Sequence, residues 1–81
     1  MRFELFTRVA LQEDLPQYKL CRGDVATIVE HHPVPDGEDG YSLEVFNAVG
    51  ETIAVITVAE SQIQPLMSNE VLHVRVLEEA V

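Results

Sequence analysis

A glycine turn that opens directly into a run of β-branched residues is the feature that most constrains the fold of this chain. Gly23 lies where the chain must reverse, and glycine adopts a positive φ there without steric cost. In residues 25–30, successive side chains alternate between two faces that are both largely apolar. Such a strand suits a position that is buried on two sides, as in a small closed barrel. We therefore expect the other strands to pair back onto residues 25–30.

The same alternation recurs before and after this central strand and predicts a meander with a closing strand. Gly50 supplies the left-handed conformation that a tight hairpin between two of these segments needs. Residues 59–62 interrupt the alternation and predict a single helical turn. The result is an all-β fold of five strands. The flanking strands are expected at residues 8–11, 41–46, 52–58 and 63–66.

The C-terminal residues admit two interpretations. In residues 70–77, leucine or valine occupies every second position from Leu72 to Val76, which favours a strand. The same region also contains a helix cap and helix-favouring residues. The strand is the preferred interpretation, and it has to pair with an exposed edge of its own sheet or of a second copy. The chain then divides into a barrel, residues 1–66, and an extension, residues 67–81, which belongs to the same domain or to an oligomer interface.

The charge balance of the chain is strongly acidic. Its 81 residues include 14 Asp or Glu against 5 Lys or Arg, which gives a formal net charge of −9. This field repels phosphate backbones, so we expect no nucleic-acid partner and favour a basic protein partner. No apolar run approaches the ~20 residues that span a membrane, and no signal-peptide pattern opens the chain. Cys21 is the single cysteine, so no internal disulfide is possible and a cytoplasmic location is expected.

The order of the predicted elements and three short motifs resemble known proteins. The predicted order is a short strand, a proline loop, a glycine turn, a three-strand meander, a helical turn and a closing strand. This order is the plan of an SH3-like barrel. The motifs are Asp14-Leu15-Pro16, Arg22-Gly23 and Ser61-Gln62-Ile63-Gln64-Pro65-Leu66. Together they resemble the small bacterial proteins grouped as domain of unknown function 4926, over roughly residues 6–66. The resemblance implies a five-stranded SH3-like barrel and a bacterial source, and it assigns no functional residue.

His31, His32 and Asp36 are the candidate metal ligands, because imidazole and carboxylate groups suit zinc or nickel. Adjacent side chains of a strand point to opposite sides, so both histidines reach one ion only if the chain turns at Pro33. A solvated loop is the preferred interpretation. Cys21 as a nucleophile needs a contacting base and an oxyanion site, and the spacing indicates neither. We therefore expect no catalytic residue, no cofactor, no metal site and no enzyme activity.

These observations favour a small acidic interaction module that neutralises a basic partner protein or is accessory to it. The alternative is an accessory or activator-type subunit of a metalloenzyme, because SH3-like barrels also form the beta subunits of nitrile hydratases and their activator proteins. A homodimer formed through the C-terminal extension is compatible with either function.

Overall fold

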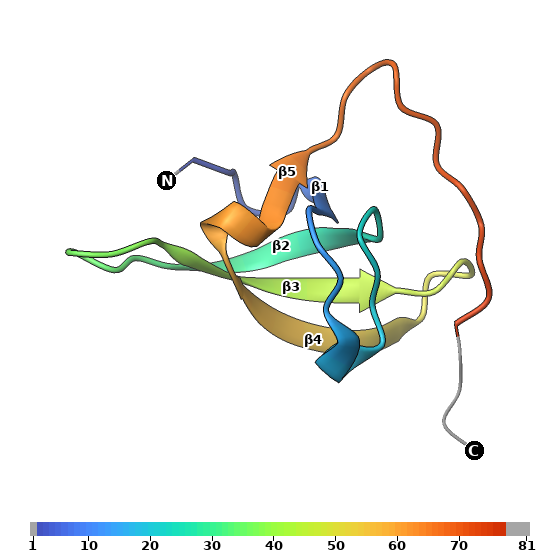
Figure 1. The fold of residues 1–81 in the computed structure, drawn as a ribbon, viewed down its shortest axis with the longest axis horizontal. Helices are drawn as coiled ribbons and strands as arrows, with labels where there is room; N and C mark the ends of the chain where they lie inside the picture. The colour runs from blue at the N-terminus through green and yellow to red at the C-terminus, as the bar shows by residue number, and fades with distance from the viewer. Residues whose placement is uncertain (1, 78–81) are drawn as a thin grey trace.

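The protein folds into one curled antiparallel sheet, shown in Figure 1. The computed structural model describes residues 2–77. The predicted all-β fold, the meander and the helical turn before the last strand are confirmed. The elements are β1 (Arg8–Leu11), η1 (Pro16–Tyr18), β2 (Val25–His32), β3 (Gly40–Phe46), β4 (Thr52–Ala59), η2 (Glu60–Gln62) and β5 (Ile63–Pro65), where η denotes a short 3₁₀ helix.

The strand order β4-β3-β2-β1-β5 leaves β4 and β5 as the two edges of the sheet. β1 pairs with β2 on one side and with β5 on the other. η2 carries the chain from one edge strand to the other. Among the described residues, strand pairing therefore produces an open five-stranded sheet.

Both glycines that were expected in the left-handed region are found there. Gly23 has φ 92° and Gly50 has φ 87°. No other atom lies within 4 Å of a Cβ added at either glycine. Glycine is therefore required by the positive φ and not by a lack of space for a side chain. The turn at Gly50 is closed by a hydrogen bond of 2.8 Å from the Asn47 N–H to the Glu51 carbonyl. The glycine turns are thus set by local backbone geometry.

The core lies on one face of the curled sheet. On β2, Ala26 and Ile28 are buried, whereas Val25, Thr27 and Val29 on the other side are half-buried. The prediction that this strand is buried on both sides is therefore wrong, because the residues on its second face remain partly exposed. The buried core consists of Phe3, Val9, Leu11, Leu15, Leu20, Ala26, Ile28, Tyr41, Leu43, Val45, Ile56, Val58 and Ile63.

β2 is longer than the sequence predicts, and this corrects the position of the two histidines. His31 and His32 pair with Tyr41 and Gly40 at the start of β3, so both histidines belong to a strand and not to the surface loop. Cross-strand pairing and contact between the His31 and Tyr41 rings favour the extended backbone there. The connection between β2 and β3 shortens to residues 33–39.

Residues 70–77 form neither the predicted strand nor the alternative helix in the single chain. We call residues 67–77 the tail. The tail leaves β5, arches away from the sheet and returns towards the turn between β3 and β4 (Figure 1). A strand needs hydrogen bonds to a neighbouring strand, and this course brings the tail alongside none of the described strands. The rest of the predicted extension, residues 78–81, lies outside the described residues.

Truncating the buried β2 side chain tests this account of the core. Ile28 is fully buried, so Ile28→Ala is expected to lower the free energy of unfolding by about 2–5 kcal/mol through lost burial and a residual cavity. Ile53→Ala is the matched control, because Ile53 is 42% exposed and its truncation should cost less than about 1 kcal/mol. Urea unfolding followed by circular dichroism measures both values. Equal losses in the two variants would contradict the assigned core.

Candidate functional site

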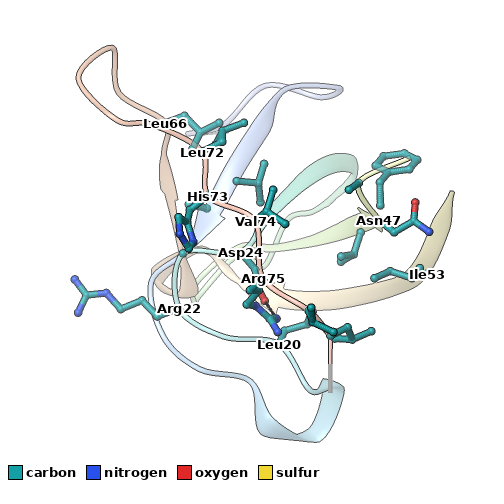
Figure 2. Close-up of a pocket in the computed structure, with 18 of the residues that line it drawn as sticks. Leu20, Arg22, Asp24, Asn47, Ile53, Leu66, Leu72, His73, Val74 and Arg75 are labelled. Atoms are coloured by element: carbon teal, nitrogen blue, oxygen red, sulfur yellow. Dashed lines mark hydrogen bonds and ion pairs between the residues drawn. The ribbon is translucent and has the colours of Figure 1, made fainter. Parts of the chain in front are cut away.

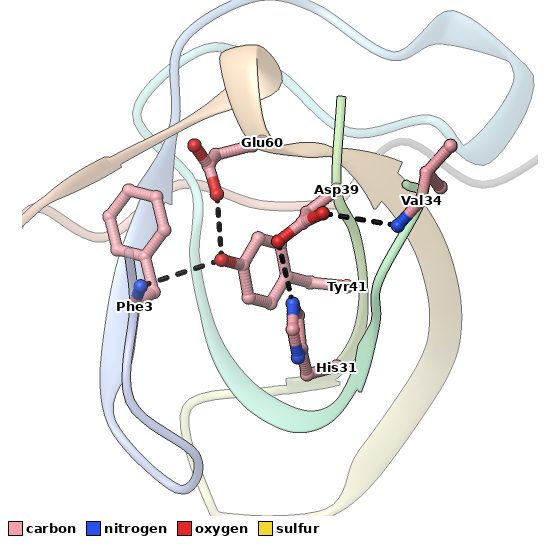
Figure 3. A network of polar contacts seen from close by, with 6 residues as sticks. All are labelled: Phe3, His31, Val34, Asp39, Tyr41 and Glu60. Atoms are coloured by element: carbon pink, nitrogen blue, oxygen red, sulfur yellow. Dashed lines mark hydrogen bonds and ion pairs between the residues drawn. The ribbon is translucent and has the colours of Figure 1, made fainter. Parts of the chain in front are cut away.

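A buried tyrosine hydroxyl is the centre of a polar network beside the core, shown in Figure 3. Tyr41, on β3, is fully buried. Its hydroxyl donates a hydrogen bond of 2.8 Å to Glu60 Oε2 and accepts one of 3.4 Å from the Phe3 N–H. Burial and the hydrogen bond to Glu60 raise the pKa of Tyr41 above its ordinary value. The hydroxyl therefore stays protonated and acts as a donor that joins β3 to η2.

His31 and Asp39 extend this network to the loop between β2 and β3. The His31 ring lies 5.2 Å from the Tyr41 ring, centroid to centroid, and its Nε2 lies 2.8 Å from Asp39 Oδ2. Asp39 Oδ1 also accepts a hydrogen bond of 3.1 Å from the Val34 N–H. The hydrogen bonds from His31 and Val34 lower the pKa of Asp39 below its ordinary value. Asp39 is thus held as an ionised acceptor that closes the base of the loop.

The same loop is attached to η2 through its backbone. The Glu60 N–H donates a hydrogen bond of 2.9 Å to the Asp39 carbonyl, and the Ser61 N–H donates one to the Glu38 carboxylate. The acidic side chains of this loop therefore serve as acceptors for backbone N–H groups. Sequence reasoning missed this network, because its partners come from five segments that no local pattern connects.

The structure does not bring the candidate metal ligands together. His31 faces Asp39 and Tyr41, whereas His32, one residue further, hydrogen-bonds Ser42 Oγ at 2.7 Å and lies 3.6 Å from a Glu30 oxygen. The two imidazoles thus occupy opposite faces of β2, as adjacent strand residues must. Asp36 lies in the loop and has no side-chain hydrogen bond to another described residue. Residues 2–77 contain no group of three or more His, Cys, Asp or Glu placed to hold a metal ion.

Two groups associated with nucleophilic catalysis also lie apart. Cys21 is exposed in the turn before β2, and its N–H donates a hydrogen bond of 2.7 Å to Asp24 Oδ2. Its thiol has no hydrogen bond to a histidine of the described chain. The His31–Asp39 pair contacts the Tyr41 ring and not a serine or thiol. The His31–Asp39 pair therefore links the β2–β3 loop to the sheet.

An open groove of about 1010 Å³ separates the tail from the end of the sheet, as Figure 2 shows. The tail, with Leu72 and Val74, forms one side, and the β3–β4 hairpin, with Asn47 and Ile53, forms the other. The tail side chains beside the groove are largely in water, with Val74 79% and Val76 90% exposed. The groove therefore has largely apolar walls and is open to solvent.

One ion pair attaches the tail to the sheet. Arg75 Nε donates a hydrogen bond of 2.9 Å to Asp24 Oδ1, and a second guanidinium nitrogen contacts the other carboxylate oxygen. Burial raises the pKa of Asp24, but hydrogen bonds from Arg75 and from the Cys21 N–H, together with the Arg75 charge, bring the pKa below its ordinary value. The bond to Asp24 in turn raises the pKa of Arg75. The other hydrogen bonds of the described tail link Met67 and Glu70 to each other.

The outer edge of β4 is a second exposed surface. β4 has eight residues, Thr-Ile-Ala-Val-Ile-Thr-Val-Ala, with no charge and no proline. Natural edge strands commonly carry lysine, proline or a bulge that prevents further pairing. In β4 the register with β3 shifts at Ile53, near the start of the strand, and is regular from Ala54 to Ala59. The other edge strand, β5, is three residues long and ends at Pro65. Ile53 and Val55 on β4 are 42% and 64% exposed. We call the outer side of β4 the β4 edge.

A family model matches most of the chain. Residues 5–65 match the family described as Domain of unknown function (DUF4926). The chain belongs to this family. The match includes all five strands and ends where the tail begins, so the groove joins the DUF4926 region to residues outside the match. No curated protein and no solved structure matches the chain. Over residues 2–77, the DUF4926 protein has no helix of the length and apolarity that crossing a bilayer requires.

Removing the Tyr41 hydroxyl tests the network in this DUF4926 protein. Tyr41→Phe leaves the Glu60 carboxylate and the Phe3 N–H without their partner, so unfolding should become easier by about 1–2 kcal/mol. Tyr18→Phe removes a hydroxyl from a 41% exposed side chain and should change stability by less than about 0.5 kcal/mol. Chemical denaturation measures both variants. A neutral Tyr41→Phe would show that the network does not stabilise the fold.

The attachment of the tail is expected to depend on pH. The pKa of Asp24 is lowered in the folded chain, so its contribution is present above the unfolded pKa of about 4 and is lost as pH falls through the folded pKa. Backbone NMR relaxation should report faster motion of residues 70–77 on acidification, and Asp24→Asn should show that motion already at neutral pH. Asp14→Asn is the control, because Asp14 accepts a bond from the Arg22 N–H and does not contact the tail. A tail with the same order in Asp24→Asn would contradict this assignment.

Proposed function

We propose that this DUF4926 protein is a protein-interaction module that adds an extended segment of a basic partner protein to the β4 edge. The observation that carries the proposal is an eight-residue edge strand without charge, proline or a covering element among the described residues. The Ala59 N–H at its end donates to Gln62, and the outward N–H and C=O groups of the rest of β4 offer a ladder to a further strand. The partner would gain affinity from main-chain hydrogen bonds and selectivity from its alternate side chains.

The charges around the β4 edge support a basic partner. Glu51 directly precedes β4 and Glu60 directly follows it, and Glu44 lies opposite Val55 in the β3–β4 register. An apolar segment with lysine or arginine at its ends would place cations beside these carboxylates. The net charge of −9 adds a long-range field that attracts such a segment. The same field disfavours nucleic acid.

We also propose that the curled sheet is of the SH3-like barrel class, in a protein of the bacterial cytoplasm. The element order and the 3₁₀ turn η2 before β5 support this class, together with the double pairing of β1. The acid-rich loop and η2 then serve as the structural end of the domain, and the β4 edge serves as its binding side. Neutralisation of a basic protein requires only such a surface and no chemistry.

Binding of a designed peptide tests the proposed function. The probe is a peptide of alternating valine and threonine with two lysines at each end, and the matched probe carries glutamates instead. The lysine peptide should bind and shift the amide resonances of β4, with affinity falling about tenfold as salt rises from about 0.05 to about 0.5 M. The glutamate peptide should not bind.

A pair of variants with equal charge locates the binding surface. Val55→Lys places a cation at the β4 edge and should weaken binding of the lysine peptide by about threefold or more. Val49→Lys adds the same charge in the hairpin turn, where Val49 is 80% exposed, and should leave affinity nearly unchanged. The proposal is abandoned if the two variants weaken binding equally, if both peptides bind alike, or if the shifted resonances lie away from β4.

A further inference from the structure

The groove differs from the rest of the molecule in its charge. Its charged lining residues other than histidine are Arg22 and Arg75, and Asp24 and Glu70, so their formal charges cancel. The chain as a whole carries −9, whereas the described lining of the groove is close to neutral. Most of the surface outside the groove repels a second copy of the same chain, whereas the groove does not. The groove is thus suited to contact between two identical molecules.

The tail has the properties of a strand that lacks a partner. Its residues alternate between an apolar row, Leu72, Val74 and Val76, and the intervening residues. In the single chain the side chains of this row are 57%, 79% and 90% exposed, so most of their apolar surface remains in water. Arg75 nevertheless holds the segment beside the groove through Asp24. An extended apolar segment fixed beside an unfilled apolar groove predicts an occupant that covers both.

We propose that this occupant is the tail of a second copy, so that two chains exchange contacts across a twofold axis with each tail lying in the groove of the other. A twofold interface requires a surface that is complementary to itself. Here one wall of the groove is the tail, and an antiparallel second tail matches it in apolar alternation and in length. Leu72 and Val74 would meet their counterparts and the hairpin side chain Ile53. This surface meets β4 at Ile53, but its occupant differs from that of the β4 edge, and the inference does not rest on the proposed function.

The electrostatics of the dimer give it a distinctive salt dependence. Two chains of −9 repel one another outside the groove, and dissolved salt screens that repulsion. Dimerisation should therefore strengthen with salt, whereas attraction of a basic partner to the acidic surface weakens. The opposite signs separate the two interactions in one experiment.

Sedimentation equilibrium of the full chain tests the inference. The protein should populate a dimer between about 10 and about 500 μM, with the dissociation constant falling as salt rises from about 0.05 to about 0.5 M. Substituting Leu72→Asp together with Val74→Asp should raise the dissociation constant about tenfold or more, because it places charge in the apolar row. The charge-matched control is the double variant Val34→Asp, Val55→Asp. These valines are 45% and 64% exposed, and neither lines the groove.

The amide spectrum separates loss of dimerisation from loss of folding in these variants. Tail residues make no strand pairing, so the amide spectrum of β1–β5 should be preserved in the Leu72→Asp, Val74→Asp protein and in a chain that ends at Leu66. A monomer throughout the concentration range overturns the inference, and so does a dimer that survives loss of residues 67–81. Titrating the lysine peptide into the shortened chain then tests the β4 edge by itself, so failure of one proposal is distinguishable from failure of the other.

Discussion

A tyrosine hydroxyl inside an apolar core has to be hydrogen-bonded, and the rest of this fold depends on how that requirement is met. A buried hydroxyl without a partner costs about 1–3 kcal/mol. Tyr41 meets the requirement with Glu60, 19 residues later, and with the Phe3 N–H, 38 residues earlier. These bonds place η2 against β3 and bring the N-terminal segment to the same point. β5, which follows η2 directly, then lies beside β1.

The acidic residues near Tyr41 accept hydrogen bonds that hold the β2–β3 loop in place, a role that net charge alone does not indicate. Asp39 accepts a hydrogen bond from the Val34 N–H within the loop and also contacts His31, and Glu38 accepts one from the Ser61 N–H of η2. A carboxylate that accepts backbone N–H groups in this way stabilises its loop. Because these groups remain ionised, they still contribute to the negative field of the molecule.

The two exposed surfaces follow from how the sheet ends. β5 is short and closed by Pro65, whereas β4 continues for eight residues with its outer side open. Glutamates lie at the two ends of β4, whereas the described lining of the groove beneath the tail has balanced charges. A cationic segment gains most at the first surface, and a copy of the same acidic chain is repelled least at the second. The β4 edge is thus suited to a positively charged segment, whereas the groove is suited to a partner that is itself acidic.

Much of the candidate architecture could be predicted because its causes are local. Alternating apolar residues identified the meander, Gly23 and Gly50 identified the left-handed turns, and the break at residues 59–62 identified η2. The extent of β2 could not be predicted, because Pro33 and the acids after it resemble a loop, while pairing of His31 with Tyr41 extends the strand. The hydrogen-bond network around Tyr41 could not be predicted either, because its hydrogen bonds join residues far apart in the chain.

The sequence by itself determined an acidic all-β chain with defined turns, since alternation and positive φ act over a few neighbouring residues. Only the tertiary structure decided that His31 and His32 face opposite ways, that the sheet edges differ, and that the tail is attached through Arg75 and Asp24 without forming a strand. The tail shows the physical reason most clearly. Its alternation is that of a strand, but strand formation needs the hydrogen bonds of a neighbouring edge, and the presence of that edge is a property of the folded chain and its partners.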